Sequence, residues 1–141
     1  MDFINELNTL RNERIAEIND EMNIESLKKF NEYMTTLFTT NNHIVKAALK
    51  NFVKNKPNVT NPSIVKDYVI PSNKSKGFDL FFKQEGRKNV KLFINNITES
   101  VYNGFNITIK DSTEYNKSLG VNTIHKITVR FEIDLLSAFR T

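Results

Sequence analysis

The sequence contains no cysteine and no tryptophan, and it has only three prolines and four glycines. Without cysteine, the chain cannot form disulfides, thiolate metal sites or thiol nucleophiles. No stretch approaches the roughly 18 consecutive apolar residues that a membrane-spanning helix requires. The first residues, Met-Asp-Phe-Ile-Asn-Glu, are acidic, whereas a secretory signal begins with basic residues. We therefore expect a chain with no membrane partner, located in the cytoplasm or in a particle assembled there.

Motifs for catalysis and for cofactor binding are also missing. There is no glycine-rich phosphate loop and no nucleophile elbow, and His43 and His125 have no metal-ligand spacing to other residues. Asp79 and Glu85, with Arg87 and Lys88 after them, come nearest to a catalytic set, since metal-dependent nucleases combine two carboxylates with a base. A hairpin with a charged tip explains these residues as well. We expect a non-enzymatic chain that holds no cofactor and no metal.

The length and composition predict one domain with its own core. The 141 residues are 39% apolar and include eleven phenylalanines, which is enough for a core without covalent staples. Two prolines, Pro57 and Pro62, mark the clearest internal boundary. We divide the domain into a helical part over residues 1–56, a linker over 57–63 and a sheet part over 64–141.

Helical periodicity dominates the first part. Apolar residues at helical spacing predict a helix over residues 2–22, a second from a possible N-cap at Asn23 to residue 40, and a third over 43–54. Arg11 and Arg14 fall within the apolar arc of the first helix. Their stems could lie over apolar neighbours or pair with a glutamate, or they could face a protein partner.

The second part changes to strand periodicity. Alternating residues predict strands over 64–70, 105–110 and 124–135, the last being the most regular. Residues 78–83 and 90–94 also alternate, and we predict a hairpin there, with Phe81 and Phe93 on its polar side. Both faces of this hairpin would then be covered, by helices or by another subunit. Residues 97–103 suit a short helix better than a strand, and 111–122 a polar loop.

These elements predict an α+β fold. Two to three amphipathic N-terminal helices would pack on a mainly antiparallel sheet of four to five strands, because an alternating strand needs a cover for its apolar face.

The net charge of +4 is unevenly distributed. Residues 1–32 have a net charge of −4, residues 33–91 of +8, and residues 92–141 are neutral. Residues 33–91 contain ten lysines and one arginine, and nine of these basic residues form a candidate contact surface. Its members are Lys46, Lys50, Lys54, Lys56, Lys74, Lys76, Arg87, Lys88 and Lys91. Such a surface could bind nucleic acid through the phosphate backbone, with steep salt dependence.

The favoured interpretation is a structural or assembly subunit that contacts other proteins in a homo- or hetero-oligomer. An acidic helical end and a basic middle could meet head to tail between neighbours. Arg11, Arg14, Phe81 and Phe93 are the candidate interface residues. Abundant Asn, Lys, Ile and Phe indicate an AT-rich genome, such as a low-GC bacterium or its phage, so a phage particle component fits. Nucleic-acid binding through the lysines is the alternative.

Overall fold

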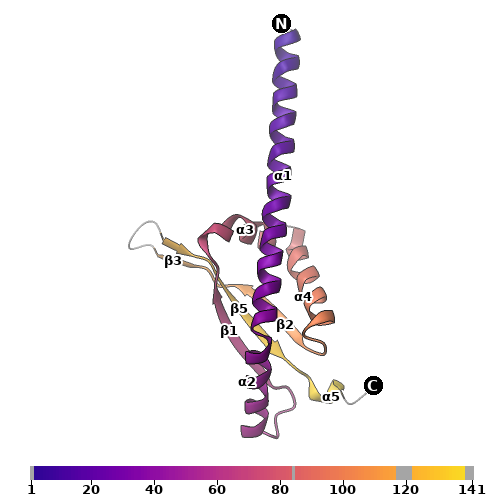
Figure 1. The fold of residues 1–141 in the computed structure, drawn as a ribbon, viewed down its shortest axis with the longest axis vertical. Helices are drawn as coiled ribbons and strands as arrows, with labels where there is room; N and C mark the ends of the chain where they lie inside the picture. The colour runs from indigo at the N-terminus through magenta and orange to yellow at the C-terminus, as the bar shows by residue number, and fades with distance from the viewer. Residues whose placement is uncertain (1, 84, 117–121, 139–141) are drawn as a thin grey trace.

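A three-stranded antiparallel sheet is covered on one face by helices, and the first helix extends far beyond this body (Figure 1). The computed structural model describes residues 2–83, 85–116 and 122–138. Within them, helix and antiparallel sheet are mixed as predicted, but the sheet has three strands and a separate ribbon has two.

The sheet contains the strands that the sequence predicted over 64–70, 105–110 and 124–135. They are β1 (Ser63–Val69), β2 (Asn106–Asp111) and β5 (Lys126–Glu132), in the order β1-β5-β2. Phe131 lies opposite Ile64 on one side and Ile107 on the other. The regular alternation of β5 thus marks the central strand, and its side chains Ile127, Val129 and Phe131 are fully buried.

The first helix, α1 (Asp2–Thr40), is continuous over 39 residues, so the predicted boundary at Asn23 is wrong. Asn is a weak helix former, but it costs a helix interior well under 1 kcal/mol, and no Gly or Pro lies nearby to end the helix. Only the C-terminal half of α1 enters the core, through Phe30, Met34 and Phe38.

The second helix, α2 (Asn42–Asn55), agrees with the prediction for 43–54. Asn41, which precedes it, does not cap α2 with its side chain and donates instead to the Leu37 backbone oxygen at the end of α1. Val45 and Leu49 of α2 are buried against the sheet.

The predicted hairpin at 78–94 is wrong, because both segments are helices. α3 (Ser75–Lys83) and α4 (Lys88–Ser100) follow short 3₁₀ turns, η1 (Ser72–Lys74) and η2 (Glu85–Arg87). Phe78 and Phe81 are three residues apart, as are Val90 and Phe93, and all four are buried. This spacing places each pair on one helical face, whereas in strands it would split them between two faces.

The remaining elements are short. α4 ends at Ser100, so the predicted helix at 97–103 begins earlier and ends earlier than expected. β3 (Glu114–Asn116) lies within the predicted loop and pairs as a ribbon with β4 (Asn122–Ile124), which begins at the end of that loop. α5 (Leu135–Ala138) follows β5 and takes up the end of the predicted strand 124–135.

Candidate protein interface

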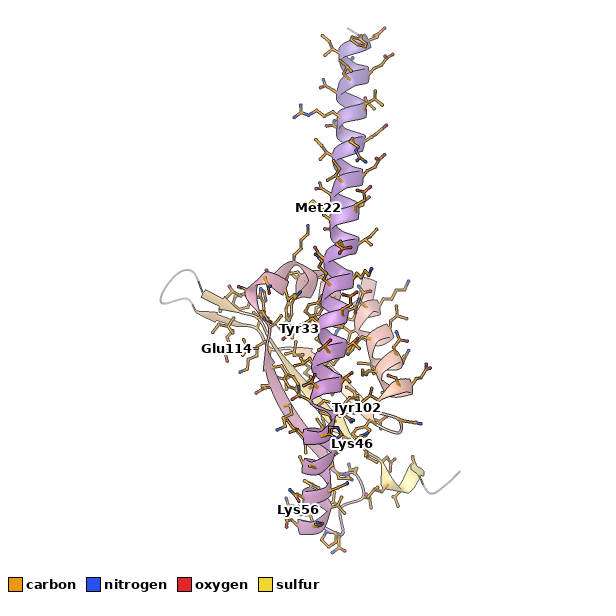
Figure 2. The ribbon with its side chains drawn as sticks, viewed as in Figure 1. Met22, Tyr33, Lys46, Lys56, Tyr102 and Glu114 are labelled. Carbon is orange, nitrogen blue, oxygen red and sulfur yellow. The ribbon has the colours of Figure 1, made fainter. Side chains whose placement is uncertain are left out.

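The N-terminal half of α1 projects from the body as a free helix, which we call the arm (residues 2–22) (Figure 1). Every residue of the arm is exposed. At 1.5 Å per residue, its 21 residues reach about 32 Å. Met22 marks the point where the arm leaves the body (Figure 2).

An apolar stripe runs along the arm at helical spacing. Its members are Phe3, Ile4, Leu7, Leu10, Ile15, Ile18 and Met22. Phe3 is 69% exposed and Leu10 61%, which are large fractions for side chains of this kind. Contiguous apolar surface of this extent usually marks an interaction site.

The body of the same chain does not cover this stripe. Ile18 of the stripe and Met34 of the core face are 16 residues apart, so at about 100° per residue they point about 160° away from each other. The stripe is therefore not a continuation of the face that packs in the core. We expected this helix to pack on the sheet, and that expectation is wrong for residues 2–22.

Internal contacts stabilise the arm little. Arg14 pairs with Glu17 at 3.0 Å and approaches Glu21 at 3.9 Å, with all three side chains exposed. Exposed pairs of this kind contribute about 0–1 kcal/mol. The arm also contains four asparagines and no core contact, so packing of the apolar stripe is the missing source of stability.

A second exposed apolar feature lies at the opposite end of the body, between α2 and the segment after β5. This α2 groove has a volume of about 570 Å³. Its floor is built from apolar side chains of four separate segments: Leu49, Val53, Pro62, Phe105, Ile133 and Leu135. Lys46, Lys50 and Lys54 form one rim, because residues four apart on α2 share a helix edge.

One rim lysine is held in place by the body. The Lys46 ammonium donates to the Val101 backbone oxygen at 3.3 Å and lies 6.0 Å from the Tyr102 ring centre. Figure 2 shows Lys46 close to Tyr102. Lys50 and Lys54 are exposed and extend the positive rim toward the end of α2.

The structure separates the predicted basic surface into two groups. Lys46, Lys50, Lys54 and Lys56 lie on and just after α2, at the end of the body farthest from the arm (Figures 1 and 2). Lys74, Lys76, Arg87, Lys88 and Lys91 lie on η1, α3, η2 and α4. Arg87 donates to the Ile109 backbone oxygen and lies over the Phe82 ring, which ties it to the body.

The four candidate interface residues also fall into two groups, one on the arm and one in the core. Arg11 and Arg14 are exposed and lie within the apolar stripe of the arm. Phe81 and Phe93 are 0% and 6% exposed, so the structure places them in the core and not at an interface. Their rings contact each other and those of Phe30 and Phe38, because α3 and α4 turn them inward.

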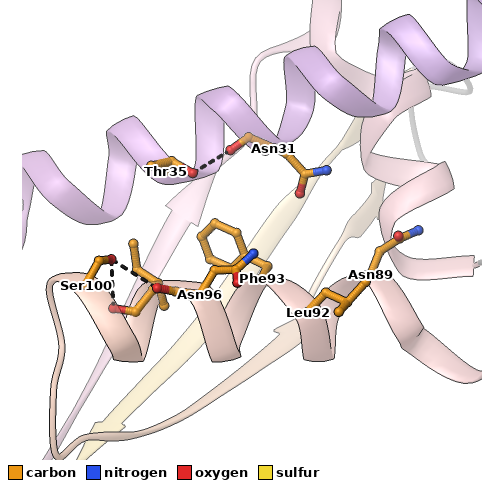
Figure 3. A pocket seen from close by; sticks show the side chains of 8 residues that line it. Asn31, Thr35, Asn89, Leu92, Phe93, Asn96 and Ser100 are labelled. Carbon is orange, nitrogen blue, oxygen red and sulfur yellow. Dashed lines mark hydrogen bonds between the residues drawn. The ribbon is translucent and has the colours of Figure 1, made fainter.

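A polar notch lies between α1 and α4 (Figure 3). It has a volume of about 350 Å³ and is lined mainly by amide and hydroxyl side chains, including Asn31, Thr35, Asn96 and Ser100. The hydroxyls of Thr35 and Ser100 donate to backbone oxygens of their own helices. Among the residues that the structure describes, none that lines the notch is charged, so these residues offer no strong electrostatic attraction for a ligand.

The structure brings no catalytic set together among the described residues. No three His, Asp or Glu side chains of these ranges form a metal-ligand group. Asp79 pairs with Lys83 of its own helix at 3.7 Å, and the Glu85 side chain lies outside what is described. In the described ranges, no helix combines the length and apolar character needed to cross a membrane.

The sequence indicated the rim of the α2 groove but missed its floor. Lys46, Lys50 and Lys54 stood out by their spacing, whereas Phe105 and Ile133 join Leu49 only through the fold. No local pattern connects residues so far apart. Comparisons of the chain with models of protein families, with curated proteins and with solved structures find no match.

Proposed function

We propose that this chain is a non-enzymatic structural or assembly subunit that contacts other proteins through its arm. One observation carries the proposal: seven apolar side chains form a stripe on a helix that the body leaves uncovered. The particle of a phage is a larger complex that suits such a subunit, and the AT-rich codon usage that the composition implies supports this choice.

The energy available from covering the stripe is substantial. Full burial of one large apolar side chain stabilises by about 1.5–3 kcal/mol, and the stripe residues remain about half exposed. Covering all seven would then contribute roughly 5–10 kcal/mol before the cost of association, which is about 4–15 kcal/mol. A partner must therefore offer a well-fitted apolar surface, and favourable charges would add to association rate and specificity.

Sedimentation of the purified chain over a wide concentration range tests the proposal. We expect a defined oligomer, and we expect Leu7→Gln with Leu10→Gln to abolish it, since glutamine keeps helix propensity while removing apolar surface. Asn12→Gln with Ala16→Gln is the matched control on the opposite face of the arm. A chain that stays monomeric at high concentration with a fully ordered arm contradicts the proposal.

Nucleic-acid binding is the second candidate, and the lysine edge of α2 favours it. Lys46, Lys50 and Lys54 follow one helix edge, as phosphate-contacting residues often do. Binding to nonspecific DNA or RNA should then weaken steeply with salt, and Lys46→Glu with Lys50→Glu and Lys54→Glu should weaken it further. Binding that ignores both changes would exclude this function. The acidic arm and the apolar groove floor beside these lysines favour a protein partner instead.

A further inference from the structure

The arm and the α2 groove have complementary surfaces. The arm presents an apolar stripe on a segment with six acidic and two basic residues, a net charge of −4. The groove presents an apolar floor beside a rim of three lysines. Both features are exposed and apolar, and the charges beside them are opposite in sign.

We infer that the arm of one copy docks into the α2 groove of a second copy. This inference rests on the proposed function and names the partner of the arm. An amphipathic helix in an apolar groove is a common mode of recognition, in which residues at positions i, i+4 and i+7 act as anchors. Phe3, Leu7 and Leu10 have this spacing and lie in the part of the arm farthest from the body (Figure 1).

The charges beside the anchors match the rim of the groove. Glu6 and Glu13 lie along one edge of the apolar stripe, within about 60° of Leu10 around the helix, whereas Glu17 pairs with Arg14 of the same arm. Glu6 and Glu13 are about 10 Å apart along the arm, and Lys46 and Lys54 about 12 Å apart along α2. An arm that packs alongside α2 therefore places a row of carboxylates against a row of ammonium groups.

The fold prevents the arm from reaching the groove of its own chain. The arm is a straight extension of α1 beyond one end of the body, and α2 lies at the other end (Figure 1). In Figure 2, Lys56, just after α2, and Met22, at the base of the arm, lie at opposite ends of the body. Docking is therefore intermolecular. The two contact surfaces differ, so the contact is head to tail and builds a ring or a filament.

Pairing of two arms with each other is disfavoured by their charges. Parallel pairing would place Arg11 opposite Arg11 and Arg14 opposite Arg14. Antiparallel pairing over the whole stripe, from Phe3 to Met22, would place Arg11 opposite Arg14. Each arm also has a net charge of −4, so both arrangements bring like charges together, which destabilises a helix pair.

Mixing two blocked variants of the full chain tests the head-to-tail contact. The arm variant is Leu7→Gln with Leu10→Gln, and the groove variant is Lys50→Glu with Lys54→Glu. Each should be at least tenfold weaker than the parent in self-association by sedimentation. Their equimolar mixture should form 1:1 dimers, because one intact arm and one intact groove remain and growth then stops. Lys88→Glu with Lys91→Glu makes the same charge change away from the groove and should assemble like the parent.

The outcomes separate this inference from the proposed function. If the groove variant assembles like the parent while the arm variant does not, the arm binds elsewhere, so the inference fails and the proposed function stands. If the arm variant also assembles like the parent, both fail. A parent that is monomeric at every concentration overturns docking to a second copy, and if its arm is also fully ordered, the proposed function fails with it.

Charge reversal provides a gain-of-function test with the same chain. Glu6→Lys with Glu13→Lys should block self-association, as should Lys50→Glu with Lys54→Glu. A mixture of these two variants should assemble again, because every arm then meets a groove of opposite charge. Recovery supports the inference, and a mixture no more assembled than its components contradicts the charge pairing.

Discussion

The phenol of Tyr102 donates a 2.7 Å hydrogen bond to the backbone oxygen of Phe38, which lies 64 residues earlier in the chain. Phe38 is in the last turn of α1, where carbonyl groups have no helical partner. The bond therefore anchors the base of α1 to the segment between α4 and β2. Because α1 continues without a break from this anchor into the arm, the anchor also sets the direction in which the helical arm leaves the body.

Replacing Tyr102 by Phe should destabilise the chain by about 1–3 kcal/mol, since the Phe38 oxygen is left buried without its donor. Urea unfolding measures this loss. Tyr115→Phe is the control, because that side chain is 71% exposed and its change should leave stability within about 0.5 kcal/mol. Equal stability of the two variants would contradict the anchoring role.

The same tyrosine predicts an alkaline loss of stability. Burial, with a smaller contribution from Tyr68, raises the pKa of Tyr102 from 10.0 to about 12. Between these values the folded chain keeps the proton and the unfolded chain releases it. The contribution of Tyr102 to the free energy of unfolding is therefore complete below pH 10. Above pH 10 it falls by about 1.4 kcal/mol per pH unit, up to about pH 12. In Tyr102→Phe, urea unfolding at pH 10 to 12 should show a shallower decline than in the parent.

The crossing of α1 and α3 depends on Gly77. A Cβ at this position would lie 2.6 Å from both the Phe30 Cβ and the Ser26 backbone oxygen. Gly77→Ala should therefore cost about 1–3 kcal/mol, more than the gain of about 1 kcal/mol in helix propensity. Thermal unfolding measures the change, with Lys76→Ala as an exposed helical control. A Gly77→Ala chain as stable as the parent would show that the two helices separate easily.

The absence of cysteine makes crosslinking of introduced thiols unambiguous. A chain with Leu10→Cys, mixed with one carrying Val53→Cys under mild oxidation, should give mainly crosslinks between positions 10 and 53. Thr9→Cys, on the opposite face of the arm, should crosslink to position 53 much less. Crosslinks mainly between two copies of position 10 would indicate that arms pair with each other.

The sequence predicted the sheet strands and α2 because their apolar patterns reflect burial on one face. It failed for α3 and α4, where Phe78, Leu80 and Phe82 alternate although the segment is helical. Phe81 is out of phase with that alternation and was the local sign of a helix. Its ring packs against Phe30 of α1, a contact that favours the helix over a strand. That contact is 51 residues apart in the chain, beyond the reach of a local pattern.

For the arm, the sequence predicted the helix correctly but not its environment. Its periodicity correctly predicted an amphipathic helix, but periodicity cannot say whether an apolar face is covered by the same chain or by another. The continuity of α1 through Asn23 removes the turn that would have folded residues 2–22 back onto the sheet. The periodicity gives the apolar face of this helix, and the fold shows that the body leaves that face uncovered. Both are needed to identify the candidate interface.

Hydrogen exchange of the arm amides as a function of protein concentration tests most directly whether the arm is a protein interface. In the dilute chain, residues 3–22 should exchange rapidly, because an uncovered helix of this composition is marginally stable. At concentrations where the chain assembles, the same amides should become protected, while those around Phe30 to Phe38 are protected throughout. Arm amides that exchange equally fast at all concentrations, with or without assembly, would contradict the account.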